Sequence, residues 1–448
     1  MIGRALLLAL LLGGVAAPAV AKAADRCAEC VTAGAASTTV RVPAGTPLAG
    51  YGAPKRRLLF PDIFGRYAHA FWFKPSVGQR DPITAKALVL ATPAARLAWV
   101  TLDLIGVDGA FVRAVQERLT RSGVPSTTLI VSASHTHSGP GAFMDSGLMG
   151  FVAVDRLDPA VRDALVENAA SAVQQADRAR GPALAGAASV TAAGLTTSRV
   201  GKPLDSEIVV LKLTTPAGAP LALVWNFAIH GTMLSAANLK LSGDVTGLAS
   251  ARLEQKLGVP ALFINGAVGD VSPARHGEAA MVDTAAALAS AVEAGWAQAR
   301  PAPVAALRTA ERRVAMPAAA VSLQRCLGSW IPPFFVVPVG SAMPREASLV
   351  AAALGDTAWV TIPGELQTAF GQAIKREGRA RFASVFVAGL SNDYLGYFTT
   401  REDARRAKYV ACATVYPPGA GACLTDAAIE LVRGLRGETA RPVSRCNS

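Results

Sequence analysis

The stretch "TTLIVSASHTHSGPG", residues 127–141, joins an apolar run to a polar loop that carries two of the five histidines of the chain. The run at residues 127–133 is short, rich in Leu, Ile and Val and bounded by polar residues, which predicts a buried β-strand. In open α/β sheets, ligands gather at the carboxyl ends of the strands. If extended geometry continues to His137, side-chain alternation places His135 and His137 on the same side of the chain. A lone histidine is usually structural, but this pair at a strand end favours a functional site.

Similar apolar runs recur along the chain and alternate with segments of helical period. The further predicted strands lie at residues 86–91, 96–104, 207–213, 221–227, 261–265, 357–362 and 383–389. The predicted helices lie at residues 109–121, 158–179, 244–257, 278–299, 365–377 and 425–436. This alternation predicts an α/β fold with mixed β-sheets flanked by helices. Because no linker, charge block or internal repeat divides the chain, we expect residues 24–448 to form one catalytic domain.

The N-terminal residues 1–23 predict a secretory signal peptide. Arg4 supplies a charge, residues 5–15 an apolar core, and small residues a cleavage site. We therefore expect export to the periplasm or the medium, and no later run approaches the ~18 apolar residues of a membrane span. The six cysteines are an even number, as expected for disulfides in an exported chain. Cys27 and Cys30 are predicted to form a local disulfide, whereas the other pairings cannot be read from the sequence.

The chain is basic, with a formal net charge of +12. Loss of the signal peptide removes Arg4, Lys22 and no acids, which leaves about +10. Without a dense Lys/Arg run, we expect no nucleic acid as a partner, and an anionic lipid or envelope surface is favoured over it. Simple solubility is the favoured explanation of the charge. The segment "WIPPFFVVPVG", residues 330–340, has prolines that break both helix and strand. It either contacts lipid or an acyl chain at the surface or forms a buried connection.

Two more residues stand where predicted strands end. His230 follows residues 221–227, and imidazole is a common zinc ligand, so His135 and His230 are two candidate ligands; a catalytic zinc needs about three. Glu365 follows the strand at residues 357–362 and is expected to begin a helix. It is either the oxygen ligand or a carboxylate that complements the helix dipole.

A further loop, "FINGAVGDVSPARHG" at residues 263–277, brings Asn265, Asp270 and Ser272 to the same edge. Its glycines allow a ligand to approach the backbone closely. Ser272 is a candidate nucleophile, but the chain has no Gly-x-Ser-x-Gly elbow. It also has no phosphate loop and no His-Glu-x-x-His helix. Hydrolysis by a metal held on loops at strand ends is therefore the favoured chemistry.

Several blocks of the sequence resemble the neutral/alkaline non-lysosomal ceramidase family, in the family's order. The blocks are "LAGYG" (48–52), "LDLIGVD" (102–108), "SHTHSGPG" (134–141), "NFAIHGT" (226–232), "LSGDVTG" (241–247), "GDVSP" (269–273), "PGE" (363–365) and "GLSNDYLGYFTT" (389–400). The resemblance implies an exported zinc amidase of sphingolipid metabolism, in which zinc-bound water attacks the N-acyl amide of ceramide and releases sphingosine and a fatty acid.

The resemblance also implies the metal ligands. They are His135, His230, Glu365 and Tyr397, with Tyr394 as the competing choice for the last position. Tyr397 is favoured because the family has a second functional tyrosine twelve residues after the ligand, where Tyr409 stands. The expected cofactor is Zn²⁺.

Four other residues receive catalytic roles from the resemblance. His137 polarises the amide carbonyl or donates to the oxyanion, and Tyr409 is a second donor. Arg199 matches a family arginine near the site. Ser272 is a nucleophile or a substrate ligand, of which we favour the second because zinc supplies the attacking water.

The chain departs from the family pattern at its C-terminal side, where "TTREDA" and "YVACAT" replace the family's "TTxEEY" and "YEGAST". It is also shorter, so we expect no separate C-terminal β-sandwich domain. The expected partner is ceramide or another N-acyl lipid, with peripheral contact to a membrane surface. Two alternatives are a zinc hydrolase of another acylated envelope amide or ester, and an inactive lipid-binding relative.

Overall fold

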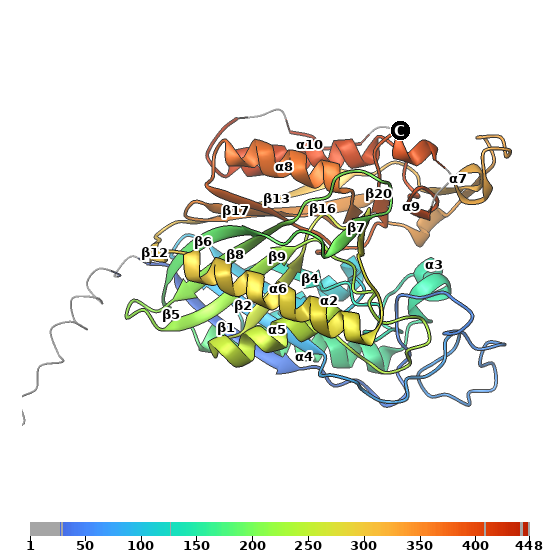
Figure 1. Ribbon diagram of the computed structural model, residues 1–448, viewed down its shortest axis with the longest axis horizontal. Coiled ribbons are helices and arrows are strands. Elements are labelled where there is room, and N and C mark those ends of the chain that lie inside the picture. The colour runs from blue at the N-terminus through green and yellow to red at the C-terminus, as the bar shows by residue number, and fades with distance from the viewer. Residues whose placement is uncertain (1–26, 28–29, 126, 407–408, 440–441, 447–448) are drawn as a thin grey trace, which may run out of the picture.

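The computed structural model describes residues 27–446, except 28–29, 126, 407–408 and 440–441 (Figure 1). The predicted signal peptide lies outside the described residues. Within them, the chain folds into three main β-sheets, each flanked by helices, as the sequence predicted. No helix in the described part combines the length and apolarity needed to cross a membrane.

The first unit contains the sheet that leads to the paired histidines. Its strands are β1 (Thr32–Thr39), β2 (Thr84–Ala91), β3 (Arg96–Leu102) and β4 (Thr128–Ala133), in the order β4-β3-β2-β1, with β5 (Gly181–Pro182) at the edge. Helices α2 (Gly109–Arg121) and α4 (Pro159–Arg178) cover one face. Helix α2 begins where the Asp108 carboxylate accepts the amide hydrogen of Phe111, and it buries Phe111, Val115 and Leu119 at helical spacing.

The second and third units follow along the chain. The second has β6 (Leu184–Thr191), β8 (Glu207–Thr214), β9 (Pro220–Phe227), β10 (Ala261–Asn265), edge strand β12 (Ala302–Pro303), and helices α5 (Asp244–Leu257) and α6 (Glu278–Gln298). The third has β13 (Leu307–Ala315), β16 (Glu346–Leu354), β17 (Thr357–Thr361), β19 (Ser384–Ala388), and helices α8 (Thr368–Arg379) and α10 (Ala420–Gly434).

The three units share one topology. Each has three antiparallel strands, a helix, a fourth strand parallel to the third, and a second helix. No internal repeat was evident in the sequence, although the units share this topology. Its consequence is functional: the loops after the third and fourth strands of every unit leave from the carboxyl ends of parallel strands, where ligand sites form.

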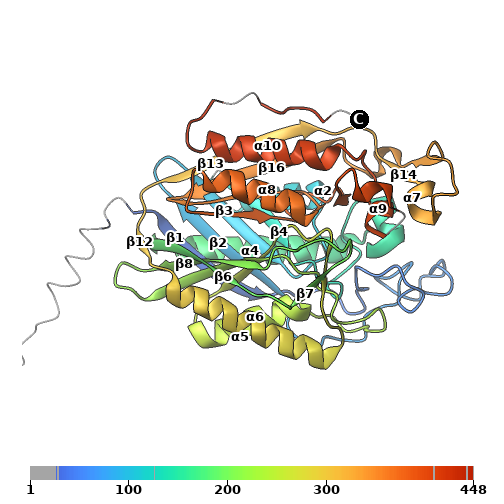
Figure 2. The ribbon, with the colours of Figure 1, turned by 45° about the horizontal axis from the view of Figure 1, so that its top comes forward.

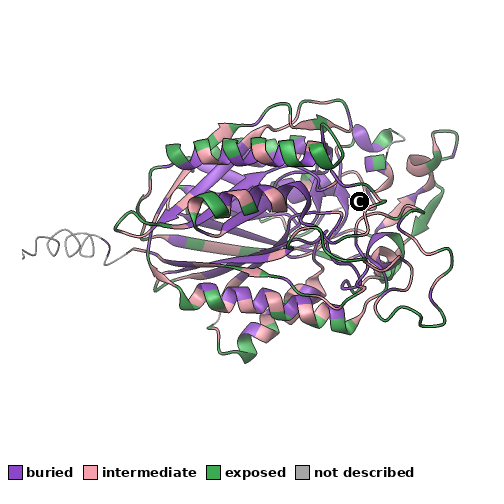
Figure 3. Cartoon of the chain, turned by 60° about the horizontal axis from the view of Figure 1, so that its bottom comes forward, coloured by how far each residue is buried: buried purple, intermediate pink, exposed green. Residues whose placement is uncertain are grey.

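The sheets face one another around a central core, and the helices lie outside. Trp99 from the first sheet stacks on Trp359 and Phe386 from the third, with ring centroids 5.3 and 6.1 Å apart, and the second sheet adds apolar side chains such as Val224. Figure 2 shows α8 and α10 on one side of the sheets and α5 and α6 on the other. The sheets are accordingly buried, while the helices expose their outer faces (Figure 3).

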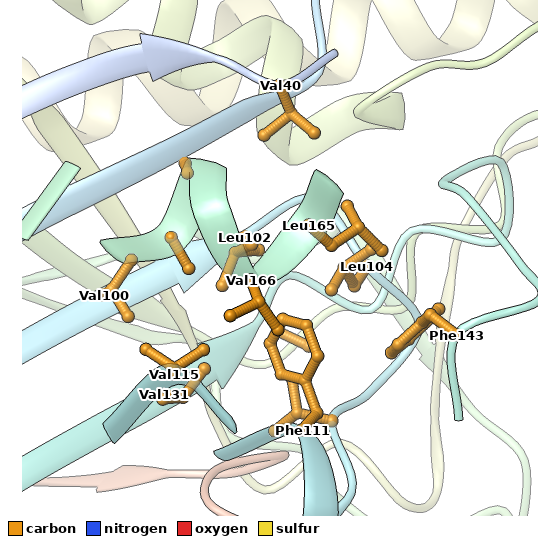
Figure 4. Close-up of a cluster of buried hydrophobic side chains, with 14 of the residues drawn as sticks. Val40, Val100, Leu102, Leu104, Phe111, Val115, Val131, Phe143, Leu165 and Val166 are labelled. Atoms are coloured by element: carbon orange, nitrogen blue, oxygen red, sulfur yellow. The ribbon is translucent and has the colours of Figure 1, made fainter. Parts of the chain in front are cut away.

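A second layer of core joins each sheet to its helices. In the first unit, Val100 and Val131 of the sheet meet Phe111 and Val115 of α2 and Leu165 of α4 (Figure 4). Corresponding clusters lie beneath α5 and α6 and beneath α8 and α10. This packing holds the strand ends, and the loops that leave them, in fixed positions.

Short elements surround the strand ends. They are α3 (Gly147–Met149), the π-helix η1 (Gly150–Val154), β7 (Thr196–Ser198), β11 (Val271–Pro273), β14 (Ala320–Ser322), α7 (Leu323–Leu327), β15 (Val336–Pro338), η2 (Gly340–Ala342), β18 (Glu365–Leu366), β20 (Tyr397–Phe398), η3 (Asp403–Arg405) and α9 (Tyr409–Cys412). Pairs β7–β11 and β18–β20 lie at the site described below.

All eight predicted strands are confirmed, and α2 and α5 have the predicted bounds. The prediction that Glu365 begins a helix is wrong, because its backbone pairs with β20 and helix α8 begins only at Thr368. Helix α10 begins at Ala420, earlier than predicted. The predicted Cys27–Cys30 disulfide is confirmed. The remaining cysteines pair as Cys326–Cys412 and Cys423–Cys446.

Candidate metal centre and active site

His135 lies in the loop after β4, on a backbone that has left the strand. Its φ of +68° is left-handed, so the expected extension of strand geometry to His137 is wrong. The loop is fixed instead by hydrogen bonds from the His135 amide to the Leu104 carbonyl, 2.9 Å, and from its Nδ1 to the Ile105 carbonyl, 2.6 Å. Because Nδ1 donates its hydrogen to Ile105, Nε2 is the ring nitrogen that faces the site.

His137 nevertheless lies beside His135, with ring centroids 5.0 Å apart. The His137 amide donates to the Gly231 carbonyl, and the His137 carbonyl accepts a hydrogen bond of 3.0 Å from the buried Arg56 guanidinium. Gly50, at φ +107°, is required here because a Cβ would lie 2.7 Å from His137 atoms. Burial and the neighbouring His135 lower the pKa of His137 well below its usual value, so the ring is neutral.

His230 reaches the same point from the loop after β9. A parallel bridge between Thr136 and Gly231 ties this loop to the first histidine loop. The His230 ring is fully buried, 4.5 Å from the ring of His135, and its Nε2 lies 3.3 Å from the Tyr397 hydroxyl. Burial and the charge of Arg199 lower the pKa of His230 to about 3, which keeps its imidazole neutral.

Glu365 completes the buried cluster from β18. Its Oε2 lies 3.0 Å from His230 Nε2 and 3.3 Å from His135 Nε2, and its Oε1 accepts a hydrogen bond from Tyr394 at 2.7 Å. Burial alone raises the pKa of a carboxyl group, but His135 and His230 outweigh it and hold the pKa of Glu365 well below its usual value.

These contacts fit a bound cation. His135 Nε2 and Glu365 Oε2 are buried without a hydrogen-bond partner in the described part of the chain, although they face each other. A nitrogen lone pair and a carboxylate oxygen at such a distance repel unless a metal ion or a proton lies between them. The ligand atoms of His135, His137 and His230 also lie within 4.8 Å of one another. Imidazole nitrogens with one carboxylate oxygen are a donor set that suits zinc.

Arg199 connects the cluster to the serine loop. Strand β7 pairs with β11, which places Thr197 opposite Ser272, and just beyond β7 the Arg199 amide donates to the Asp270 carbonyl. The Arg199 Nε donates to Ser272 Oγ at 2.7 Å, and its Nη1 donates to the Tyr397 hydroxyl at 3.2 Å. The predicted site residues from three separate loops are thereby joined in one network.

The tyrosines occupy distinct positions. Tyr397 faces His230 and Arg199, whereas Tyr394 is bonded to Glu365 on its other oxygen. Tyr409, at the start of α9, has its ring 5.9 Å from that of Tyr397 and is 67% exposed, so it lies at the mouth of the site. Burial raises the pKa of Tyr397 and of Tyr394 well above the usual value.

A cavity of about 720 Å³ borders the network at Arg199 and Ser272. Tyr51 and the loop that contains Met233 and Leu234 also line it. The Tyr51 ring lies 4.9 Å from that of His137, and its hydroxyl donates to the Leu234 carbonyl. The cavity therefore reaches the residues beside the histidine cluster, whereas the four predicted metal ligands do not line it.

Sequence reasoning missed two supporting residues. Asn265 donates to the carbonyls of Ser134 and Ile229 and accepts from the amide of Ile229, so it joins the strand ends before both histidine loops. Its position after a strand was noted, but nothing indicated this role. Tyr51 stands in the block "LAGYG", but no role was predicted for it. Its place in a block that resembles the family was the one signal in the sequence that it lies near the site.

The chain is similar to a known protein family. Residues 70–292 match the family model for neutral/alkaline non-lysosomal ceramidase, N-terminal. The resemblance to the neutral ceramidases is confirmed. The matched range includes His135, His137, His230 and Ser272, whereas Glu365 lies beyond it.

Two solved structures share the fold. Neutral ceramidase from Pseudomonas aeruginosa is 18% identical, with a TM-score of 0.78 over 92% of this chain and 76% of that chain. A ceramidase complexed with C2 is 19% identical, with a TM-score of 0.78 over 92% of this chain and 77% of that chain. The shared fold therefore extends over nearly the whole described chain, including the third unit, which the family model does not reach.

Proposed function

We propose that the protein is an exported zinc-dependent amidohydrolase that cleaves the N-acyl amide of ceramide into sphingosine and a fatty acid. The observation that carries the proposal is the buried convergence of His135, His230 and Glu365 beside a cavity, in a chain that resembles the neutral ceramidases. Export is supported by the sequence of residues 1–23 and by the disulfides of the described chain.

Zinc would be held by His135, His230, Glu365 and Tyr397. When bound, zinc supplies a water molecule with a pKa near ~7 and polarises the substrate carbonyl. His135 Nδ1 donates to a backbone carbonyl, which leaves Nε2 as its ligand atom, and the pKa of His230, about 3, keeps that imidazole neutral. Glu365 is engaged by its neighbours and is not free to act as the general base.

His137 is the candidate donor to the amide oxygen. Both of its ring nitrogens are buried and lack hydrogen-bond partners among the described residues. Since its pKa is lowered, the ring carries one N–H and can donate it as negative charge develops on the oxygen. Loss of one such donor typically lowers the rate about 10²–10³-fold.

Ser272 is positioned to bind substrate. Its oxygen accepts a hydrogen bond from Arg199, and a guanidinium cannot take up the proton that a serine nucleophile must lose. The same bond leaves the serine O–H available to a substrate polar group. Arg199 therefore orients Ser272 and Tyr397 together.

The first experiment combines metal content with fatty-acid release from a short-chain fluorescent ceramide. We expect about one zinc per chain in the parent protein and loss of both zinc and turnover in His230→Ala. His69→Ala is the matched control, because His69 contacts Asp158 rather than the histidine cluster. It should keep both properties.

Other results would redirect the proposal. A parent that holds no zinc and gains no hydrolysis when zinc is added would contradict it. Zinc without ceramide turnover would favour another acylated amide or ester, to be found with a panel of N-acyl substrates. Vesicle binding without release of any fatty acid would favour a lipid-binding relative.

A further inference from the structure

Two loops near the mouth of the site expose large apolar side chains. The first apolar loop, residues 58–68, exposes Leu59 at 90%, Phe60 at 76%, Ile63 and Phe64. The second apolar loop, residues 327–338, exposes Trp330 at 78%, Phe334 at 74% and their neighbours Leu327, Phe335, Val336 and Val337. Large apolar side chains gathered on protruding loops mark an interaction surface. The second loop includes most of residues 330–340, whose prolines were expected to exclude a regular element. That expectation is wrong at Val336–Pro338, which form the short strand β15 paired with β14.

Each loop is attached to the site. The first begins after Arg56, whose guanidinium donates to the carbonyls of Ala49 and His137. The second is tied by the Cys326–Cys412 disulfide to helix α9, which begins with Tyr409.

The two loops also lie on one face of the molecule. Arg57, at the base of the first loop, stacks on Phe151 of η1, and Ser146 next to α3 donates to the carbonyl of Ala342 after the second loop. Figure 1 shows both loops projecting from the same end of the molecule, with α3 between them. Phe151 is itself about half exposed and extends the apolar surface between the loops.

The charge on the two loops themselves is positive. Lys55, Arg66 and Arg345 are exposed at or beside them, and Asp62, the one acid within residues 58–68 and 327–338, is only 7% exposed. The exposed acids Asp145 and Glu346 lie outside the loops. Residues 323–345 contain no acidic residue at all. Aromatic tips beside basic side chains suit the interface of a membrane whose lipids are anionic.

We propose that the two apolar loops insert together into the interface of an anionic lipid bilayer and hold the mouth of the site against it. The inference rests on the proposed function, because an N-acyl lipid substrate resides in such a bilayer. A second copy of the chain fits less well, since a symmetric contact through this face would oppose like charges.

The test compares the parent with a variant that combines Phe60→Ser, Phe64→Ser, Trp330→Ser and Phe334→Ser. These side chains are exposed, so the fold should be retained. We expect sedimentation with phosphatidylcholine vesicles that contain phosphatidylglycerol to weaken by at least about tenfold, and hydrolysis of vesicle-borne ceramide to fall with it. Hydrolysis of a soluble short-chain ceramide should be unchanged. Val77→Ser with Val282→Ser removes exposed apolar side chains elsewhere and should leave vesicle binding intact.

Three outcomes would overturn the inference. They are equal vesicle binding by parent and variant, binding that is indifferent to phosphatidylglycerol and salt, and a parent dimer in light scattering that the variant converts to monomers. If the variant loses vesicle binding and the parent hydrolyses neither substrate, the membrane-docking face is supported and the proposed function is rejected. The soluble substrate therefore separates the two failures.

Discussion

The first and third units have the same topology but contribute different chemistry to the site. In the first unit, the loop after the third strand gives the Leu104 and Ile105 carbonyls that hold His135, and the loop after the fourth gives His135 and His137. In the third unit, the loop after the third strand gives Glu365, and the loop after the fourth gives Tyr397. The common topology decides where the loops meet, and the side chains decide what they do there.

The largest expected effect distinguishes the contributions of these two units. Glu365→Gln keeps the shape of the side chain but removes the charge that faces His135 and His230. We expect the variant to lose its metal on dialysis and kcat/KM to fall at least about 10³-fold. His137→Gln should keep the metal and lose mainly kcat. Metal analysis of both variants, with kinetics on soluble ceramide, measures the difference.

If Glu365→Gln kept the metal and His137→Gln lost it, the set of metal ligands would differ from the one proposed. His135, His137 and His230 also converge, so a metal held by three histidines alone would survive Glu365→Gln and be lost in His137→Gln. In that case the first and second units would bind the metal, and Glu365 would serve only to orient the histidines.

Most strands that are continuous apolar runs were predictable, and β9, β10 and β19 were predicted. An exception is β16, a buried but Ala-rich run that was missed because alanine does not favour strands. Other missed strands are less apolar: β13 reads "LRTAERRVA", with an exposed charged face, and β1 is rich in Ala, Ser and Thr. Their place in the sheets depends on pairing with distant segments, which no local pattern records.

The site was predictable in its residue types and only partly in its geometry. Histidines at strand ends indicated a metal site, and the resemblance added Tyr397 and Arg199. The left-handed backbone of His135 and the pairing of Glu365 with β20 were not foreseen. Both are set by hydrogen bonds to loops far away in the sequence, such as that from His135 to Leu104.

A smaller effect should follow from Gly50→Ala, which crowds His137. In Gly50→Ala, the new Cβ would meet His137 backbone and ring atoms at 2.7 Å, and the φ of +107° is unfavourable for alanine. We expect kcat to fall about 10²-fold, metal content to stay the same, and stability to fall by about 1–3 kcal/mol.

Gly194→Ala provides the control for backbone strain. Gly194 also has a positive φ, +78°, but a Cβ there has nothing within 4 Å. That variant should lose some stability and keep its kcat. Equal kcat in the two variants would show that the position of His137 matters little to the reaction.

The smallest expected effect concerns the contact between the second and third units. Glu207 of β8 accepts from Arg379 and lies 2.7 Å from Lys375, both on α8. Burial alone raises the pKa of Glu207, but these two cations outweigh it and lower the pKa from 4.5 to about 2. A carboxyl group with a lowered pKa in the folded state stabilises the protein above its unfolded pKa, and this stabilisation is lost as the pH falls.

Glu207→Gln should therefore be less stable than the parent by about 1–2 kcal/mol near neutral pH, because the ion pairs are partly screened by water. The difference should shrink between pH 4.5 and about 2, the interval between the two pKa values. Urea unfolding with the disulfides intact measures it. Glu346→Gln breaks the exposed pair with Arg313 within the third unit, so it should cost no more than about 0.5 kcal/mol. If the two variants lose equal stability, the contact between units is no stronger than a surface ion pair, and apolar packing of the sheets alone must hold the loops of the site together.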